Sequence, residues 1–169
     1  MSEEIKAKFS FKPLAIAGVM AIVLGLLFWL VDSMFCWGAC RAAMGEHGFV
    51  NSLMYSLQWF FGGLIYIVTT IVFLAASFFG ATYRPSAPCG NKFVAAIPQL
   101  FTFILAIAVA VLCVWTGVDM YRMAIYFWWE GFWVTFNGVF QFLIATVMSL
   151  LSVLAVALTG FFFVKRLTK

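Results

Sequence analysis

Residues 93–130 read FVAAIPQLFTFILAIAVAVLCVWTGVDMYRMAIYFWWE, a long apolar run followed by a short amphipathic segment. The apolar part, 93–118, exceeds the roughly 20 residues that a helix needs to cross the hydrocarbon core of a bilayer. Three further runs of this kind lie at about 14–35, 53–79 and 132–164. The sequence therefore predicts an all-α, polytopic integral membrane protein with four transmembrane helices in a single membrane domain, 1–169.

The amphipathic part of this stretch is 119–130. At about 100° per residue, Asp119, Arg122 and Glu130 fall within one arc of a helix, and apolar side chains cover the opposite side. Such a helix is typical of the boundary between water and lipid, where tryptophan is enriched. We therefore predict an interfacial helix before the last span, with Arg122 paired to its acidic neighbours. The interfacial residues are Asp119, Arg122, Trp128, Trp129 and Glu130.

The composition excludes a soluble globular protein. Of the 169 residues, 66% are hydrophobic and 9% are charged, whereas soluble domains carry roughly 25% charged residues. The lipid bilayer is therefore the first predicted partner. The ten lysines and arginines are scattered at the ends of the apolar runs, which makes them topology signals, and we predict no binding to nucleic acid.

The charge distribution predicts the orientation. In a four-span arrangement, eight of the ten basic residues lie on the side of the two termini and the middle loop, and two, Arg41 and Arg122, lie on the other side. The positive-inside rule then places both termini in the cytoplasm. We predict a multi-pass protein of a bacterial inner membrane.

Small and polar residues at helical spacing predict where the helices pack. Alanine and glycine allow close approach of helices in a membrane, and amides can form hydrogen bonds across them. The predicted packing and intramembrane polar residues are Ala17, Ala21, Gly25, Gln58, Gln99, Asn137, Gln141, Ala145 and Ser149. No charged or histidine residue lies deep within a predicted span, which argues against a proton-coupled pump.

Four residues after the first span repeat at steps of four, four and three: Cys36, Cys40, Met44 and His47. On a continuous helix they would share one face, and thiolate, thioether and imidazole are ligands that suit Cu(I). Glycines at 38, 45 and 48 favour a broken helix and no special chemistry. Both interpretations stay open, and the sequence identifies no cofactor.

The same cysteines suggest a second chemistry. Four spans, inward termini and an outward cysteine pair form a topology similar to that of the DsbB and VKOR membrane thiol oxidoreductases. Their motif is Cys-x-x-Cys, whereas here Cys36 and Cys40 are separated by three residues, and 119–130 contains no second pair. The resemblance would imply thiol exchange at Cys36 and Cys40.

The sequence favours a function without catalysis. We predict a structural, assembly or regulatory subunit of a larger inner-membrane complex that packs against other integral membrane subunits, as a hetero- or homo-oligomer. The first alternative is a thiol-disulfide or copper-binding redox protein using Cys36 and Cys40. The second is a small oligomeric channel lined by Gln58, Gln99 and Gln141.

Overall fold

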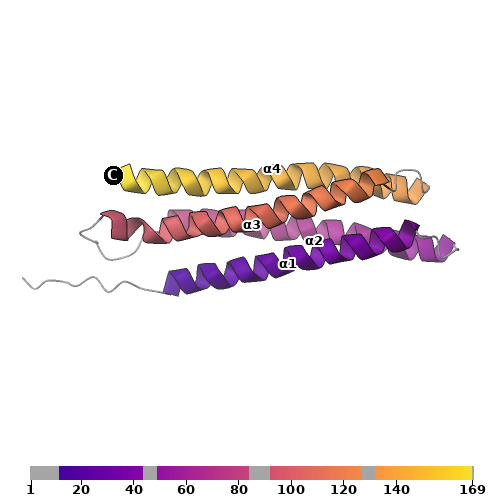
Figure 1. Cartoon of the computed structure of the whole chain (residues 1–169), viewed down its shortest axis with the longest axis horizontal. Coiled ribbons are helices and arrows are strands. Elements are labelled where there is room, and N and C mark those ends of the chain that lie inside the picture. Colours follow the sequence, from indigo (N-terminus) through magenta and orange to yellow (C-terminus); the bar gives the residue numbers. More distant parts are fainter. Residues whose placement is uncertain (1–11, 44–48, 84–91, 127–131, 169) are drawn as a thin grey trace, which may run out of the picture.

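The computed structural model describes residues 12–43, 49–83, 92–126 and 132–168, which form four long α-helices (Figure 1). The helices are α1 (Lys12–Ala43), α2 (Phe49–Thr82), α3 (Lys92–Tyr126) and α4 (Phe132–Thr168). All four are long and apolar enough to cross a membrane, and the described residues contain no strand. The predicted all-α fold with four transmembrane helices is therefore confirmed.

The segment predicted as a separate interfacial helix is continuous with the preceding span. Residues 119–126 form the last two turns of α3, and 127–131 lie outside the described residues. Neither proline nor glycine occurs between Gly117 and Tyr126 to end the helix, and Gly117 is buried against α2 and α4. The structure thus differs from the prediction here, because packing holds this part of the chain along the axis of the span.

Successive helices are antiparallel, and the bundle has four corners (Figure 1). α1 packs against α2 and α3, α4 packs against the same two helices, and α2 and α3 also touch across the centre. The α3–α4 interface is the most extensive. α1 and α4 lie at opposite corners, and the N-terminal half of α1 stands apart from the other helices in Figure 1.

Large side chains fill the centre of the bundle. Phe28, Trp59, Tyr66 and Met120 are at most 1% exposed. The Phe28 and Tyr66 rings meet edge to face, with 5.8 Å between their centroids and 72° between their planes, an arrangement that aromatic pairs favour. The core therefore runs along the whole bundle and joins α1, α2 and α3 near its middle.

One contact shows how closely α2 and α4 pack. Gly63 of α2 is buried beneath the side chain of Gln141, and a Cβ atom at position 63 would lie 2.5 Å from Gln141 Oε1 and 2.8 Å from its Nε2. Gly18 of α1 is the opposite case, because a Cβ atom there would meet nothing within 4 Å. The two glycines provide a matched pair for measuring the importance of close approach.

We expect Gly63→Ala to lower the free energy of unfolding by about 1–3 kcal/mol, because the Gln141 amide must move and overpacking destabilises a well-packed core. Gly18→Ala should leave stability unchanged or raise it by up to about 1 kcal/mol, since alanine favours a helix. Unfolding in mixed micelles of rising SDS content, followed by tryptophan fluorescence, measures both. Equal effects at the two positions would contradict this account of the α2–α4 contact.

Candidate functional site

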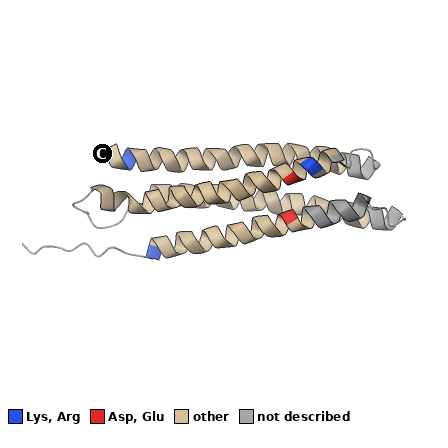
Figure 2. Ribbon diagram, in the orientation of Figure 1, with Lys and Arg blue, Asp and Glu red and all other residues tan. Residues whose placement is uncertain are grey.

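A charged cluster joins α1 and α3 toward one end of the bundle and consists of Asp32, Asp119 and Arg122 (Figure 2). Arg122 Nη1 lies 3.3 Å from Asp119 Oδ1, one helical turn away. The Arg122 side chain is 70% exposed and that of Asp119 is 18% exposed. The predicted pairing of these residues within the helix is present, and an exposed pair of this kind adds little stability.

Asp32 brings a second carboxyl group to this cluster from α1. It lies near enough to Asp119 for the two carboxyl groups to interact, and its Oδ1 atom is buried without a hydrogen-bond partner. Two neighbouring ionised carboxylates repel each other. No group of three or more His, Cys, Asp or Glu residues in the described part of the chain could hold a metal ion.

Beyond the charged cluster, a buried amide joins α4 to α2. Gln141 is fully buried, and its Nε2 atom donates to the backbone carbonyl of Trp59 at 3.0 Å and to Asn137 Oδ1 at 3.1 Å. Aromatic pairs flank it, with ring centroids 5.1 Å apart for Phe60 and Phe140. Polar groups are therefore turned inward between α2 and α4 at this end of the bundle.

A second polar contact crosses the centre of the bundle from α2 to α3. The Tyr66 hydroxyl donates to the backbone carbonyl of Cys113 at 2.9 Å and lies 3.4 Å from its Sγ atom. Thr70 Oγ1 lies 3.7 Å from the same sulfur. These residues were not predicted from the sequence. A tyrosine in mid-span, away from the interfacial depth that tyrosine prefers, could have indicated Tyr66.

The predicted packing residues occupy different environments. Gly25 lies against α3, where a Cβ atom would be 3.3 Å from Leu112 Cδ1. Ala145 is 2% exposed at the α3–α4 interface, and Ser149 lies close to Gly117 of α3. Ala17 and Ala21, in contrast, line a cavity between α1, α2 and α3.

The glutamines also differ from one another. Gln99 is 3% exposed, and its Nε2 atom donates to the backbone carbonyl of Tyr83 at 2.6 Å. Gln58 is half-buried. Since Gln99 and Gln141 are turned into the bundle, they do not present their amides to a surface that a second copy could share.

Several predicted residues cannot be placed. α1 continues unbroken through Cys36, Gly38 and Cys40 to Ala43, so the glycine at 38 does not end the helix. The side chains of Cys36 and Cys40 lie outside the described part of the structure. The same is true of Met44, His47, Trp128, Trp129 and Glu130. The copper and redox hypotheses therefore stay predictions.

Comparisons with known proteins found no matching family model, no matching curated protein and no matching solved structure.

The acid pair provides a test of the charged cluster. We expect Asp32→Asn to raise the free energy of unfolding at pH 7 by about 1 kcal/mol, because the amide can donate to Asp119 and one negative charge is removed. Asp119→Asn should not stabilise the protein, since it also removes the partner of Arg122. SDS unfolding of both variants measures the difference, and a loss of stability in Asp32→Asn would contradict the described geometry.

The contact between Tyr66 and Cys113 can be tested by removing the hydroxyl group of Tyr66. We expect Tyr66→Phe to destabilise the bundle by about 0.6 kcal/mol and at most about 1.7 kcal/mol, the range measured for hydrogen bonds between membrane helices. Tyr121→Phe is the control, because the Tyr121 ring stacks on Phe142 at 4.2 Å and retains that contact. Equal loss of stability in both variants would show that the hydroxyl of Tyr66 has no special role.

Proposed function

We propose that this chain is a structural or assembly subunit of a larger inner-membrane complex and acts through helix packing. Both termini would lie in the cytoplasm, as the basic residues at that end of the bundle support. The partner would be another integral membrane subunit. One observation carries the proposal: the candidate spans of α3 and α4 are much longer than a bilayer is thick.

The mismatch can be expressed as lengths. α3 and α4 each contain a candidate span of 33 residues, which rises about 50 Å at about 1.5 Å per residue. The hydrocarbon core of a bilayer is about 30 Å thick. Placing such a span wholly in lipid would need a tilt of more than about 50°, whereas transmembrane helices tilt by about 20° on average and by at most about 40°. Part of the apolar surface therefore extends beyond the lipid.

Charged and tryptophan residues support one placement of the bilayer. Along α1, the distance from Lys12 to Asp32 is about 30 Å at about 1.5 Å per residue, one hydrocarbon thickness. Trp29 and Trp115 are 67% and 63% exposed about one turn before Asp32 and Asp119, which suits the headgroup depth that tryptophan prefers. A charged side chain at the bilayer centre costs about 2.5–3.5 kcal/mol or more. The lipid is thus best placed between Lys12 and the charged cluster.

The part of the bundle beyond that cluster is called here the outer segment and comprises residues 53–62 of α2, 123–125 of α3 and 136–144 of α4. Gly138 lies against Ala124, and Gln141 bonds to Trp59, so the three stretches share one level. Large apolar side chains between 41% and 63% exposed cover it. They are Met54, Leu57, Phe61, Ile125, Phe136, Val139 and Leu143.

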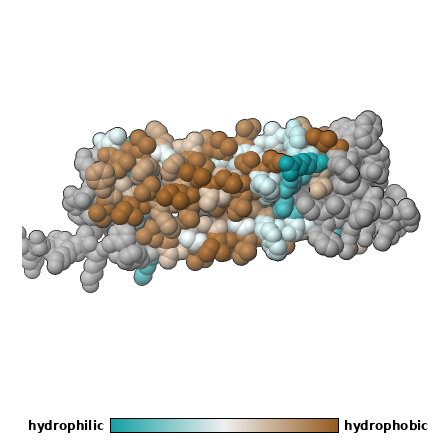
Figure 3. All heavy atoms as spheres, in the orientation of Figure 1, coloured by the Kyte–Doolittle hydropathy of each residue, from teal (hydrophilic) through white to brown (hydrophobic). Residues whose placement is uncertain are grey.

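Figure 3 shows the same pattern on one face of the molecule. A broad hydrophobic surface is interrupted by a hydrophilic patch at the position of the charged α3 residues of Figure 2, and hydrophobic atoms lie on both sides of that patch. Exposed apolar patches larger than several hundred Å² mark interaction sites. Coverage of the outer segment by another subunit would remove this apolar surface from water.

The proposal is tested by labelling a single cysteine with a membrane-impermeant maleimide. In a chain with Cys36, Cys40 and Cys89 replaced by serine, Leu143→Cys reports on the outer segment. We expect it to be labelled when the protein is reconstituted alone in vesicles at low density, and protected in native membranes where the partner covers it. A photo-crosslinking residue at Leu143 then captures the partner, whose mass distinguishes another protein from a second copy.

Leu150→Cys is the matched control, because Leu150 is 66% exposed on the same face of α4, two turns deeper than Leu143. It should remain unlabelled in both membranes, since lipid surrounds it. Protection of Leu143→Cys in vesicles of the protein alone would overturn the placement of the outer segment outside the lipid. Equal labelling of Leu143→Cys in vesicles and in native membranes would overturn the proposed partner.

A further inference from the structure

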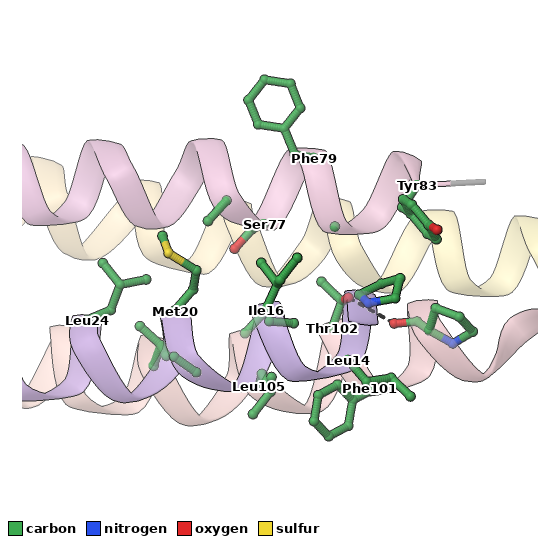
Figure 4. A pocket seen from close by; sticks show the side chains of 18 of the residues that line it. Leu14, Ile16, Met20, Leu24, Ser77, Phe79, Tyr83, Phe101, Thr102 and Leu105 are labelled. Carbon is green, nitrogen blue, oxygen red and sulfur yellow. Dashed lines mark hydrogen bonds between the residues drawn. The ribbon is translucent and has the colours of Figure 1, made fainter. Parts of the chain in front are cut away.

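A cavity of about 610 Å³ lies between α1, α2 and α3 at the end of the bundle opposite the outer segment (Figure 4). It follows α1 from Lys12 to Leu24, a distance of about 18 Å. Close contacts hold α1 after the cavity: Leu24 is 2% exposed in the core, a Cβ atom at Gly25 would lie 3.3 Å from Leu112 Cδ1, and the Phe28 carbonyl accepts a hydrogen bond from Thr116 at 3.5 Å. Before that point α1 stands apart from its neighbours (Figure 1).

The wall of the cavity is mostly apolar, and α1, α2 and α3 each form one side. Met20 and Leu24 of α1 and Ser77 of α2 point into the space between these helices in Figure 4. On the opposite side, the Gln99 amide donates to the Tyr83 carbonyl and ties the end of α2 to α3. α2 and α3 are thus joined on one side of the cavity, and α1 closes the other side.

The dimensions of the cavity decide what fits. An apolar space about 18 Å long beside the bilayer suits an extended hydrocarbon chain.

The charge at its mouth decides the headgroup. Lys12 is exposed at the first turn of α1 and lines the cavity. It lies where the hydrocarbon ends in the placement used above, which is the depth of lipid phosphates. Its positive charge attracts an anionic group.

We propose that this cavity binds one acyl chain of an anionic phospholipid, with its phosphate against Lys12. The lipid enters from the bilayer between α1 and the wall formed by α2 and α3. Binding fills space that the four helices leave open and ties the N-terminal half of α1 to the bundle.

Native mass spectrometry of the full chain tests this. The protein is released from nanodiscs that contain equal amounts of phosphatidylcholine and phosphatidylglycerol with identical acyl chains. We expect one retained lipid, with phosphatidylglycerol favoured about fivefold, the factor for one lysine contact at a membrane surface. Lys12→Gln should abolish the preference for phosphatidylglycerol while a lipid is still retained.

The hydrocarbon contact is tested separately by filling the cavity. Ala17→Phe should remove the retained lipid of either kind, and Ala76→Phe, from the α2 side, should do the same if the first variant fails to fold. Circular dichroism and gel filtration verify the fold. The controls Lys165→Gln and Ala157→Phe are exposed on α4 outside the cavity and should behave as the wild type.

Three results would overturn the proposal: no retained lipid in the wild type, equal loss of headgroup preference in Lys165→Gln and Lys12→Gln, or wild-type lipid retention in the folded cavity-filling variants.

Discussion

The thickness of the bilayer is the constraint on which the rest of this structure depends. A hydrocarbon core of about 30 Å accommodates the stretch between Lys12 and Asp32 and no more. Everything beyond that length must either be covered or be solvated. The helices continue beyond that length, and in the proposed placement one part of the bundle lies in lipid and another apolar part lies outside it. The two parts are packed as one continuous bundle.

Polar side chains serve two different purposes in this bundle. Threonine hydroxyls mostly bond to carbonyls of their own helix, as in Thr69 to Ile65 at 2.8 Å and Thr146 to Phe142 at 2.9 Å. Such bonds satisfy the hydroxyl without choosing a neighbouring helix. Tyr66 and Gln141 bond instead to backbone carbonyls of another helix. These few contacts specify which helices are neighbours. Apolar packing alone would not do so, because the apolar surfaces of the four helices are similar.

The number and approximate positions of the helices could be predicted from the sequence, because each apolar run is long enough to cross a bilayer. The pairing of Asp119 with Arg122 followed from helical periodicity. The Tyr66–Cys113 contact could not be predicted in this way, since the two residues are 47 positions apart. A tyrosine in mid-span draws attention to Tyr66 but does not identify its partner. The cavity beside Ala17 could not be predicted either. Alanines at helical spacing occur both where another helix packs closely and where a cavity remains, so the pattern does not distinguish the two.

The place of α1 in the bundle has a consequence for biosynthesis. α1 leaves the ribosome before α2 and α3, the two helices that receive it, and α3 ends at Tyr126. At about 5–20 residues per second, several seconds pass between the emergence of Ala43 and that of Tyr126. During this interval α1 resides in the membrane without its complete docking surface. The hydrophobicity of α1 must hold it in the membrane until then. This accounts for the uniformly apolar sequence between Lys12 and Asp32.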